Sequence, residues 1–297
     1  MRSVKSLLAA GAASLISSMA FAADMPIAAP PPMYAPPAPP ADFGGWYLRG
    51  DIGFSNQSAK SIRSTNDALY ANNVTFSQTN GFDTGGIFDV GVGYRVNNWF
   101  RADVTGQYRG RTNLHGLDLA TFPAGGGLIA SGSDNYGGSK SEWLFLANAY
   151  VDLGTWWCVT PFIGAGVGAS RVTISNFTDS GLNNAHVGPP PTFTPSVGGP
   201  PVASFYSAST ASQWNFAWAL HTGLAYKVNP NLTLELAYSY VNLGDGITGP
   251  AYAFDGSGGG HPFKVKDITS HDVKLGVRWN LDSPPAYMPP PPLVTKG

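Results

Sequence analysis

Polar and apolar residues alternate at every step over residues 271–280 of this 297-residue chain, which read HDVKLGVRWN. Asp272, Lys274 and Arg278 fall in one alternate set, while valine, leucine and tryptophan fill the other. Successive side chains of a β-strand point to opposite faces, so a period of two predicts a strand whose faces meet different surroundings. The fold must therefore place an apolar environment on one side of this strand and a polar one on the other.

Seven further segments show the same period, each with one alternate set that is free of charge. They predict strands over residues 46–54, 88–96, 100–108, 143–153, 163–167, 214–226 and 232–238. Three connections are short, whereas those over 56–81, 111–139, 175–212 and 244–268 are long. We therefore expect an all-β fold, an eight-stranded antiparallel transmembrane β-barrel with four long extracellular loops and short periplasmic turns.

A soluble β-sandwich also alternates, and the aromatic residues distinguish the two folds. Aromatic side chains gather at the predicted strand ends, as membrane interfaces select, and the polar set holds few charges. Those beside the short turns or the termini are Trp46, Tyr94, Trp99, Trp156, Trp157, Tyr226 and Trp279. Those beside the long connections are Phe54, Tyr108, Trp143, Trp214 and Tyr240. Two such girdles favour the membrane barrel.

The chain ends predict export and periplasmic tails. Residues 1–22 combine Arg2 and Lys5, an apolar stretch from Leu7 and the motif Ala-Phe-Ala at 20–22, which together indicate a cleaved secretory signal peptide. Residues 23–44 form a proline-rich periplasmic segment, 45–281 the barrel, and 282–297 a proline-rich periplasmic tail. We expect the mature protein to lie in the cell outer membrane.

Charge, cysteine and glycine content exclude several other classes. The net charge of -1 provides no field that draws nucleic acid, so no nucleic-acid partner is expected. The single cysteine, Cys158, is expected to be an unpaired thiol in a turn. The run FIGAGVGAS resembles a phosphate loop, but no helical period follows it. Gly164, Gly166 and Gly168 are expected to make room inside a narrow barrel.

The polar alternate set places charges of both signs in the predicted lumen. Eight strands enclose an interior that side chains alone can fill, and buried charges are tolerable only when paired. The pattern favours a salt-bridged plug over an open pore. The predicted lumen charges are Arg49, Asp51, Asp89, Arg95, Arg101, Asp103, Arg109, Glu142, Asp152, Lys227, Glu235, Asp272, Lys274 and Arg278.

The histidines do not form a catalytic grouping with serine and an acid in the predicted strands. His115, His186 and His261 fall in the long connections, His221 points inward, and His271 lies on the lipid-facing set near a strand end. The chain also lacks the cysteine and histidine spacing of a zinc site. We therefore expect no enzymatic activity, cofactor or metal.

The segments WYLRGDIG, LANAYVDLG, TPFIGAGVG and HDVKLGVRWNL resemble the small outer-membrane β-barrel proteins of alphaproteobacteria, which include porin-family and surface-antigen proteins related to the OmpA membrane domain. The resemblance covers about residues 45–281. It implies a monomeric barrel inserted by the barrel-assembly machinery, with Lys274, Gly276, Trp279 and Leu281 matching the insertion signal. The family's signal usually ends the chain with an aromatic, whereas here a proline-rich tail follows Leu281.

Three functions are compatible with this pattern. The first is a structural outer-membrane protein that contributes to envelope integrity and displays its loops, with outer-membrane lipids as its surroundings. The second is a narrow porin-like diffusion channel. The third is an adhesin or ligand binder, including a haem binder, that captures an extracellular ligand or host surface through its loops. The candidate loop residues for this third function are Tyr70, Tyr136, Phe205, Tyr206 and Tyr252, with His115, His186 or His261.

Overall fold

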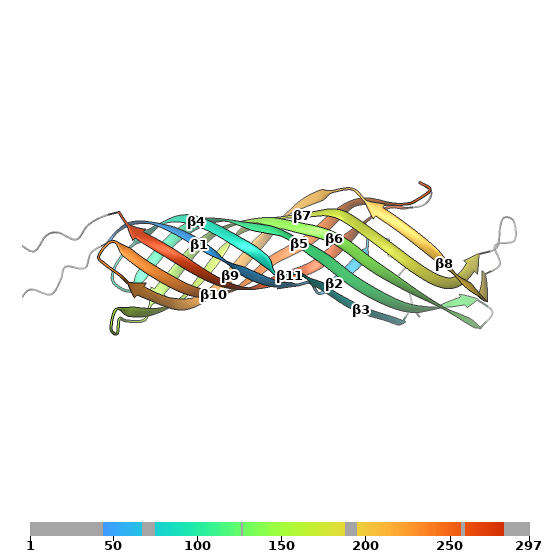
Figure 1. Cartoon of the computed structure of the whole chain (residues 1–297), viewed down its shortest axis with the longest axis horizontal. Helices are drawn as coiled ribbons and strands as arrows, with labels where there is room; N and C mark the ends of the chain where they lie inside the picture. Colours follow the sequence, from blue (N-terminus) through green and yellow to red (C-terminus); the bar gives the residue numbers. More distant parts are fainter. Residues whose placement is uncertain (1–43, 67–74, 126, 188–194, 257–258, 282–297) are drawn as a thin grey trace, which may run out of the picture. The chain divides into compact units, whose positions relative to one another are not determined.

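A computed structural model describes residues 44–66, 75–125, 127–187, 195–256 and 259–281 of the chain. The described residues form strands joined by turns (Figure 1). The strands are β1 (Gly45–Ser58), β2 (Ser61–Ser64), β3 (Thr75–Phe82), β4 (Gly85–Arg95), β5 (Phe100–Gly125), β6 (Leu128–Asp152), β7 (Val159–Val187), β8 (Pro195–Ala208), β9 (Ala211–Lys227), β10 (Leu232–Ala253) and β11 (Gly259–Asn280). Within these described ranges, no helix is long and apolar enough to cross a membrane.

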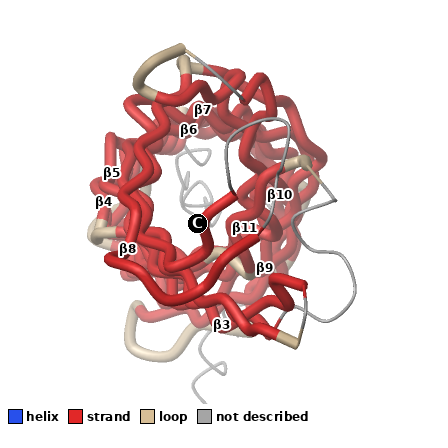
Figure 2. The backbone as a smooth tube through the Cα atoms, turned by 90° about the vertical axis from the view of Figure 1, so that its right-hand side faces the viewer, coloured by secondary structure: helices blue, strands red, loops and turns tan. Residues whose placement is uncertain are grey.

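Eight of these strands close into a ring of antiparallel pairs. The order is β1, β4, β5, β6, β7, β9, β10 and β11, and each strand is hydrogen-bonded to the next. The ring closes because β11 pairs with β1, from Tyr47 opposite Asn280 to Ser58 opposite Thr269. Figure 2 shows this ring end-on. The prediction of an eight-stranded antiparallel barrel is confirmed.

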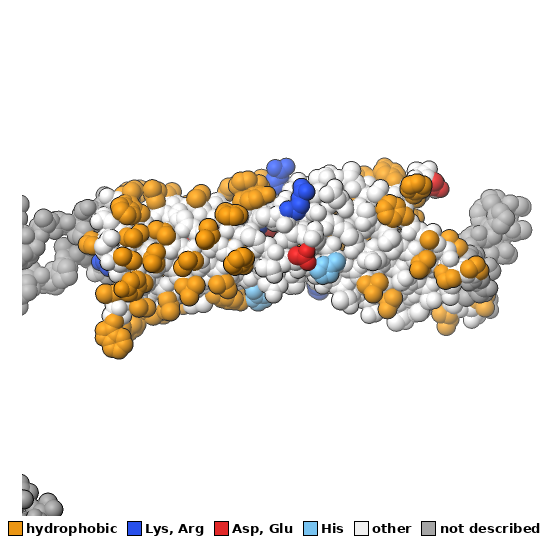
Figure 3. Space-filling model, viewed as in Figure 1, with side chains coloured by type: hydrophobic (Ala, Val, Ile, Leu, Met, Phe, Trp, Pro, Cys, Tyr) orange, Lys and Arg blue, Asp and Glu red, His pale blue; other side chains and the backbone are white. Residues whose placement is uncertain are grey.

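The outward face of the ring is apolar over the part next to the short turns. Leu48, Ile52, Val104, Leu220 and Leu275 are all about half exposed or more. Figure 3 shows apolar side chains dense over one end of the ring. Water does not favour a continuous apolar band of this kind, whereas the hydrocarbon of a bilayer does. This part of the ring is the membrane-spanning part.

Aromatic side chains border the apolar band at both sides, as the sequence predicts. Exposed rings lie beside the short turns and the termini (Trp46, Tyr94, Trp99, Trp156, Trp157, Tyr226 and Trp279) and toward the other side of the band (Phe54, Tyr108, Trp143 and Trp214). Tyr240 is half-buried, because its ring packs 5.6 Å from that of Trp218 and 5.2 Å from that of His271.

The four segments predicted as long loops are largely strands. A tilted strand crosses a bilayer in about 9–11 residues, whereas β6 has 25 residues and β7 has 29. The strands therefore continue well beyond the membrane, on the side opposite the short turns (Figure 1). Three additional strands complete the sheet there, since β2 pairs with β11, β3 pairs with β5, and β8 pairs with both β7 and β10. We call this part the extracellular extension.

Much of the inner face of the extension is apolar, which reverses the arrangement in the membrane. Ile62, Leu114, Phe177, Leu243 and Val265 lie almost fully buried in one continuous core. Outside the bilayer the barrel is surrounded by water, so its apolar residues gain by facing inward, as in a soluble β-protein.

Irregularities in the strands change which of the two alternate sets of side chains points inward. Register shifts interrupt β5 between Arg109 and Thr112 and β10 on either side of Gly244. Asn176 in β7 and Asp267 in β11 adopt positive φ, at 53° and 50°. At each irregularity, one strand of the pair carries one extra residue. Beyond that residue, the side chains of this strand exchange faces.

Candidate functional site

The lumen of the membrane-spanning part contains a cluster of charges centred on Glu235 of β10. Its carboxylate lies 2.9 Å from Arg278, 3.4 Å from Arg101 and 3.5 Å from Arg49. These guanidinium groups come from β11, β5 and β1 and are buried. One carboxylate therefore serves three cations, and strand pairing around the whole ring is needed to bring them together.

Two of the three arginines contact further carboxylates. Arg49 lies 2.9 Å from Asp51 and 3.0 Å from Asp103, and Arg101 lies 3.2 Å from Asp152. The guanidinium of Arg101 also stacks 4.3 Å from the ring centroid of Tyr150. These contacts compensate for the removal of the charges from water.

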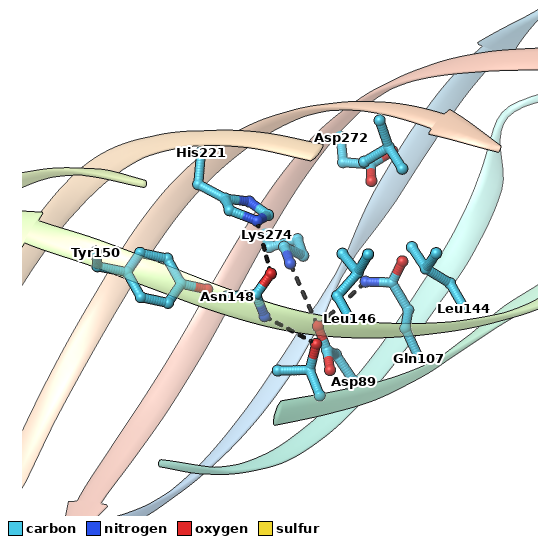
Figure 4. A pocket seen from close by; sticks show the side chains of 11 residues that line it. Asp89, Gln107, Leu144, Leu146, Asn148, Tyr150, His221, Asp272 and Lys274 are labelled. Carbon is cyan, nitrogen blue, oxygen red and sulfur yellow. Dashed lines mark hydrogen bonds and ion pairs between the residues drawn. The ribbon is translucent and has the colours of Figure 1, made fainter. Parts of the chain in front are cut away.

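A second polar layer follows toward the extracellular side, and Figure 4 shows it from close by. Lys274 Nζ lies 3.3 Å from Asp89, and Gln107 Nε2 donates to the same carboxylate at 3.2 Å. The cavity between these groups has a volume of about 10 Å³. A space of this size accommodates about one water molecule.

His221 belongs to the same layer and contacts a serine and an amide. Its Nδ1 lies 2.8 Å from Ser239 Oγ, and its Nε2 lies 3.2 Å from Asn148 Oδ1. This trio superficially resembles a nucleophile with its base. It is buried inside the ring beside a cavity of water size, so a substrate has no access to Ser239.

Two buried ion pairs form the extracellular end of the polar region. Arg109 contacts Asp272 through both guanidinium ends, and Lys140 contacts Glu142 and Gln57. Lys140 is almost fully buried and was missed in the sequence. It lies two residues before Glu142 and so shares its face, and extending the alternation by one step would have found it.

The apolar core of the extension lies beyond these pairs. Leu144 and Leu146 of β6 connect the two regions, since they line the 10 Å³ cavity and also belong to the core. Phe177 and Phe263 pack with ring centroids 4.8 Å apart, and the ring of Tyr136 stacks 5.9 Å from that of Phe177. The lumen is thus filled first by ion pairs and then by hydrocarbon.

The structure places the predicted lumen charges as follows. Those buried inside the ring are Arg49, Asp51, Asp89, Arg101, Asp103, Arg109, Glu142, Asp152, Glu235, Asp272, Lys274 and Arg278. Arg95 is half-buried at the last residue of β4. The inward placement of Lys227 is wrong: the residue is exposed at the end of β9, where the strand leaves the barrel for the turn and water reaches its ammonium group.

Glycines make room for the bulky members of the network. A Cβ at Gly164 would lie 2.4 Å from the ring of Tyr150, and one at Gly166 would lie 2.0 Å from Asn148 Oδ1. The predicted space-making role is confirmed at these two positions. Gly276, predicted as part of the insertion signal, faces Asp51, and a Cβ there would lie 1.8 Å from the carboxylate.

The other residues of the predicted insertion signal divide between the two faces of β11 and its end. Lys274 is buried in the lumen, whereas Trp279 and Leu281 are exposed on the outside. Cys158 is an exposed free thiol in the turn before β7, as predicted.

Few of the predicted ligand-binding loop residues come together. His115 is exposed and lies 3.9 Å from Asp83, and Phe205 and Tyr252 are also exposed. Tyr136 is wrong as a surface candidate, because it is buried in the core of the extension. Tyr206 and His261 line one cavity. Tyr70 and the side chain of His186 lie outside the described residues.

The cavity lined by Tyr206 and His261 has a volume of about 310 Å³. Asp134 and Asp179 also line it, and Asp118 lies on the neighbouring strand. Burial raises the pKa of all three carboxyl groups, and that of Asp179 reaches about 7 because Asp134 and Asp118 add their repulsion. This acidic cavity is a feature of the extension that the sequence did not reveal.

A closed ring of eight antiparallel strands with an apolar outer band and two aromatic girdles defines a transmembrane β-barrel. The family model for the outer membrane protein beta-barrel domain matches residues 8–280, and the chain belongs to this family. The protein is accordingly an outer-membrane protein.

Relatives have similar length and come from several bacteria. An uncharacterized protein of Brucella abortus is 30% identical over 278 residues, covering 82% of this chain and 88% of the relative. The outer membrane protein PagN of Salmonella typhimurium is 28% identical over 210 residues, covering 67% and 75%. A Rickettsia bellii protein whose name proposes an adhesin is 27% identical over 238 residues, covering 80% and 88%.

Proposed function

We propose that the protein is a non-conducting outer-membrane barrel that strengthens the envelope and presents its extracellular extension to external partners. The observation that carries this proposal is the filled lumen. Arg101, Glu235 and Arg278 occupy the membrane-spanning interior, and a continuous apolar core follows them. Ions crossing this path would have to break buried pairs and then enter hydrocarbon, and both steps are costly.

The length of the strands supports the second part of the proposal. An anchor alone needs only about 9–11 residues in each strand, whereas β5, β6 and β7 continue far beyond that length. Hydrogen-bonded strands around a packed core hold a binding surface in one arrangement and so lower the entropy lost on binding. The Rickettsia relative named as an adhesin is consistent with this role.

The route to the membrane belongs to the same proposal. Residues 1–22 act as the export signal, and residues 23–44 and 282–297 remain in the periplasm as proline-rich tails. The barrel-assembly machinery reads Lys274, Gly276, Trp279 and Leu281 during insertion. We assign no catalytic role to the lumen residues.

Conductance measured in a planar bilayer tests the closed lumen. Refolded protein comprising residues 23–297 is expected to stay silent while its gel mobility shifts on heating as that of a folded barrel does. The matched variant replaces Glu235, Arg101 and Arg278 by alanine and Asp152 by asparagine, because Asp152 would otherwise lose its partner Arg101. Arg49 keeps the carboxylates of Asp51 and Asp103. Steady, discrete currents from the unmodified protein would contradict the proposal and favour the channel.

Cell-surface binding tests the display function. A variant in which residues 122–130 are replaced by Asn-Gly shortens the hairpin of β5 and β6 beyond the paired residues Thr121 and Ser131. Bacteria carrying it are expected to bind host cells less well than those carrying the unmodified protein at equal surface amounts. Equal binding by bacteria that lack the protein altogether would refute the display function.

A further inference from the structure

The acidic cavity of the extension is built from residues of six strands. Ser64 ends β2, and Asn66 follows it. The other lining residues are Asp134 of β6, Asp179 and Asn183 of β7, Ser204 and Tyr206 of β8, Ala251 of β10, and Gly259, His261 and Phe263 of β11. The cavity therefore combines carboxylates, neutral hydrogen-bonding groups and an apolar wall. Its volume lies at the lower end of the range of sites for small organic ligands, about 300–1,000 Å³, and its lining is more polar than that of most such sites.

Strand register concentrates its negative charge. Asp118 of β5 lies directly opposite Asp134 of β6, and Asp179 of β7 lies between Tyr136 on one neighbour and Tyr206 on the other. Like charges placed directly opposite each other on a sheet are destabilising. The fold nevertheless holds three carboxyl groups on three adjacent strands.

The three carboxyl groups differ in their partners. Asp118 accepts hydrogen bonds from Gln78 Nε2 at 2.6 Å and from Tyr136 Oη at 2.7 Å. Asp179 is only 8% exposed, and its Oδ1 has no hydrogen-bond partner among the described residues. A buried carboxylate oxygen without a donor is costly, so its presence beside a cavity indicates a donor that comes from outside.

The electrostatic surroundings of Asp179 specify the sign of that donor. Every influence on its pKa raises it, namely burial and then the charges of Asp134 and Asp118. Within the described part of the chain, no cation is among these influences. A cationic donor would therefore relieve both the missing hydrogen bond and the repulsion between the carboxylates.

We propose that this cavity binds the ammonium group of an extracellular alkylamine. The ammonium group donates to Asp179 and Asp134, and its alkyl stem lies against Phe263, Tyr206 and Ala251. An ammonium group offers three donors, which suits two carboxylates and a neighbouring hydroxyl such as that of Ser204. The aromatic and aliphatic wall favours an organic cation with a stem over a hydrated metal ion.

This inference rests on the proposed display function, since it names the chemistry of the partner. Titration calorimetry at pH 8 with cadaverine as the probe tests it on refolded protein in detergent. The neutral 1,5-pentanediol and the acidic glutarate have similar length and serve as ligand controls. Cadaverine is expected to bind at least about tenfold more tightly than either. Equal affinity for cadaverine and pentanediol would overturn the inference.

Matched variants locate the site. Asp179→Asn and Asp134→Asn keep the side-chain shape, remove one charge and relieve repulsion, so both variants are expected to fold. Each is expected to weaken cadaverine binding by at least about tenfold. The control is Asp83→Asn, which removes an exposed carboxylate of the extension. Unchanged affinity in both cavity variants, or an equal loss in the control, would place binding elsewhere.

The same titration distinguishes two possible sources of the ammonium group. Nα-acetyl-lysine methylamide represents a lysine side chain of a protein, and cadaverine represents a free polyamine. Tighter binding of one of them identifies the source, and either result supports the site. If cadaverine fails to bind protein that is silent in the bilayer and still mediates cell binding, the amine site is refuted while the proposed function stands.

Discussion

Replacing Glu235 by glutamine removes one negative charge from the centre of the lumen and keeps the shape of the side chain. Arg49 and Arg101 retain the carboxylates of Asp51, Asp103 and Asp152. Arg278 loses Glu235, its ion-pair partner among the described residues. Its guanidinium then stays buried without a carboxylate within ion-pair distance among the described residues.

The magnitude follows from that stranded cation. Removing one partner of a buried ion pair costs about 3–5 kcal/mol, so Glu235→Gln should lower the free energy of unfolding by about that amount. Asp152→Asn is the graded control, because Arg101 still has Glu235 at 3.4 Å. This second change should cost less, about 1.5–3 kcal/mol, the value of one hydrogen bond to a charged group.

Urea unfolding of the refolded barrel in lipid vesicles, followed by tryptophan fluorescence, measures these differences. The double variant Glu235→Gln with Arg278→Gln removes the stranded cation as well. It should be more stable than the sum of the two single changes predicts, by at least about 1 kcal/mol. A Glu235→Gln protein within about 0.5 kcal/mol of the unmodified barrel, or strict additivity in the double variant, would refute the reasoning.

Three further predictions follow from individual contacts. Gly276→Ala should slow or block refolding in pure lipid without any assembly factor, because the new Cβ would meet Asp51 at 1.8 Å; normal refolding with impaired insertion in cells would instead assign Gly276 to recognition alone. Leu243→Ala should lower the unfolding free energy by about 2–5 kcal/mol, since Leu243 is fully buried, while Lys227→Gln, at an exposed position, should leave it unchanged in the same denaturation assay. The folded-state pKa of Asp179 is about 7, above the usual value of 3.8, so the folded protein holds a proton that the unfolded chain releases between about pH 4 and 7. Stability should fall across that window as pH rises, and Asp179→Asn should flatten this part of the pH profile; a profile that this substitution leaves unchanged would contradict the assignment.

The membrane-spanning half was predictable because each face of its strands meets one kind of surroundings. Leu275 and Val277 face lipid while Lys274 and Arg278 face the lumen, so the period of two is unbroken from His271 to Asn280. The girdle residues were found for the same reason. Where the alternation is regular, it predicts which face of the strand each side chain occupies.

The extension was not predictable from that rule, because its strands change phase. Arg109 and Thr112 both point inward although they are three residues apart, and the same change of parity separates Ile174 from Phe177 in β7. The alternation of apolar and polar residues therefore breaks at these points, and a broken alternation suggests a loop. Glycine and asparagine, which accept the required backbone conformation, also suggest a loop.

The partners inside the lumen needed information that no single strand contains. Arg49, Arg101 and Arg278 belong to three strands, and they meet at Glu235 on a fourth only when every register in the ring is fixed. The alternation predicts that these side chains point inward and leaves their pairing open. The acidic cavity was hidden for a related reason, since Asp134 and Asp179 lie in segments whose strand phase was not recognised.

The change of phase also determines what lies between the charge network and the extracellular side. The apolar core begins where the charge network ends, and Leu144 and Leu146 belong to both the water-sized cavity and the core. Water entering from the extracellular side would have to pass that core before reaching Lys274 or Asp89. The ion pairs therefore stay in a medium of low polarity, where separating them is costly.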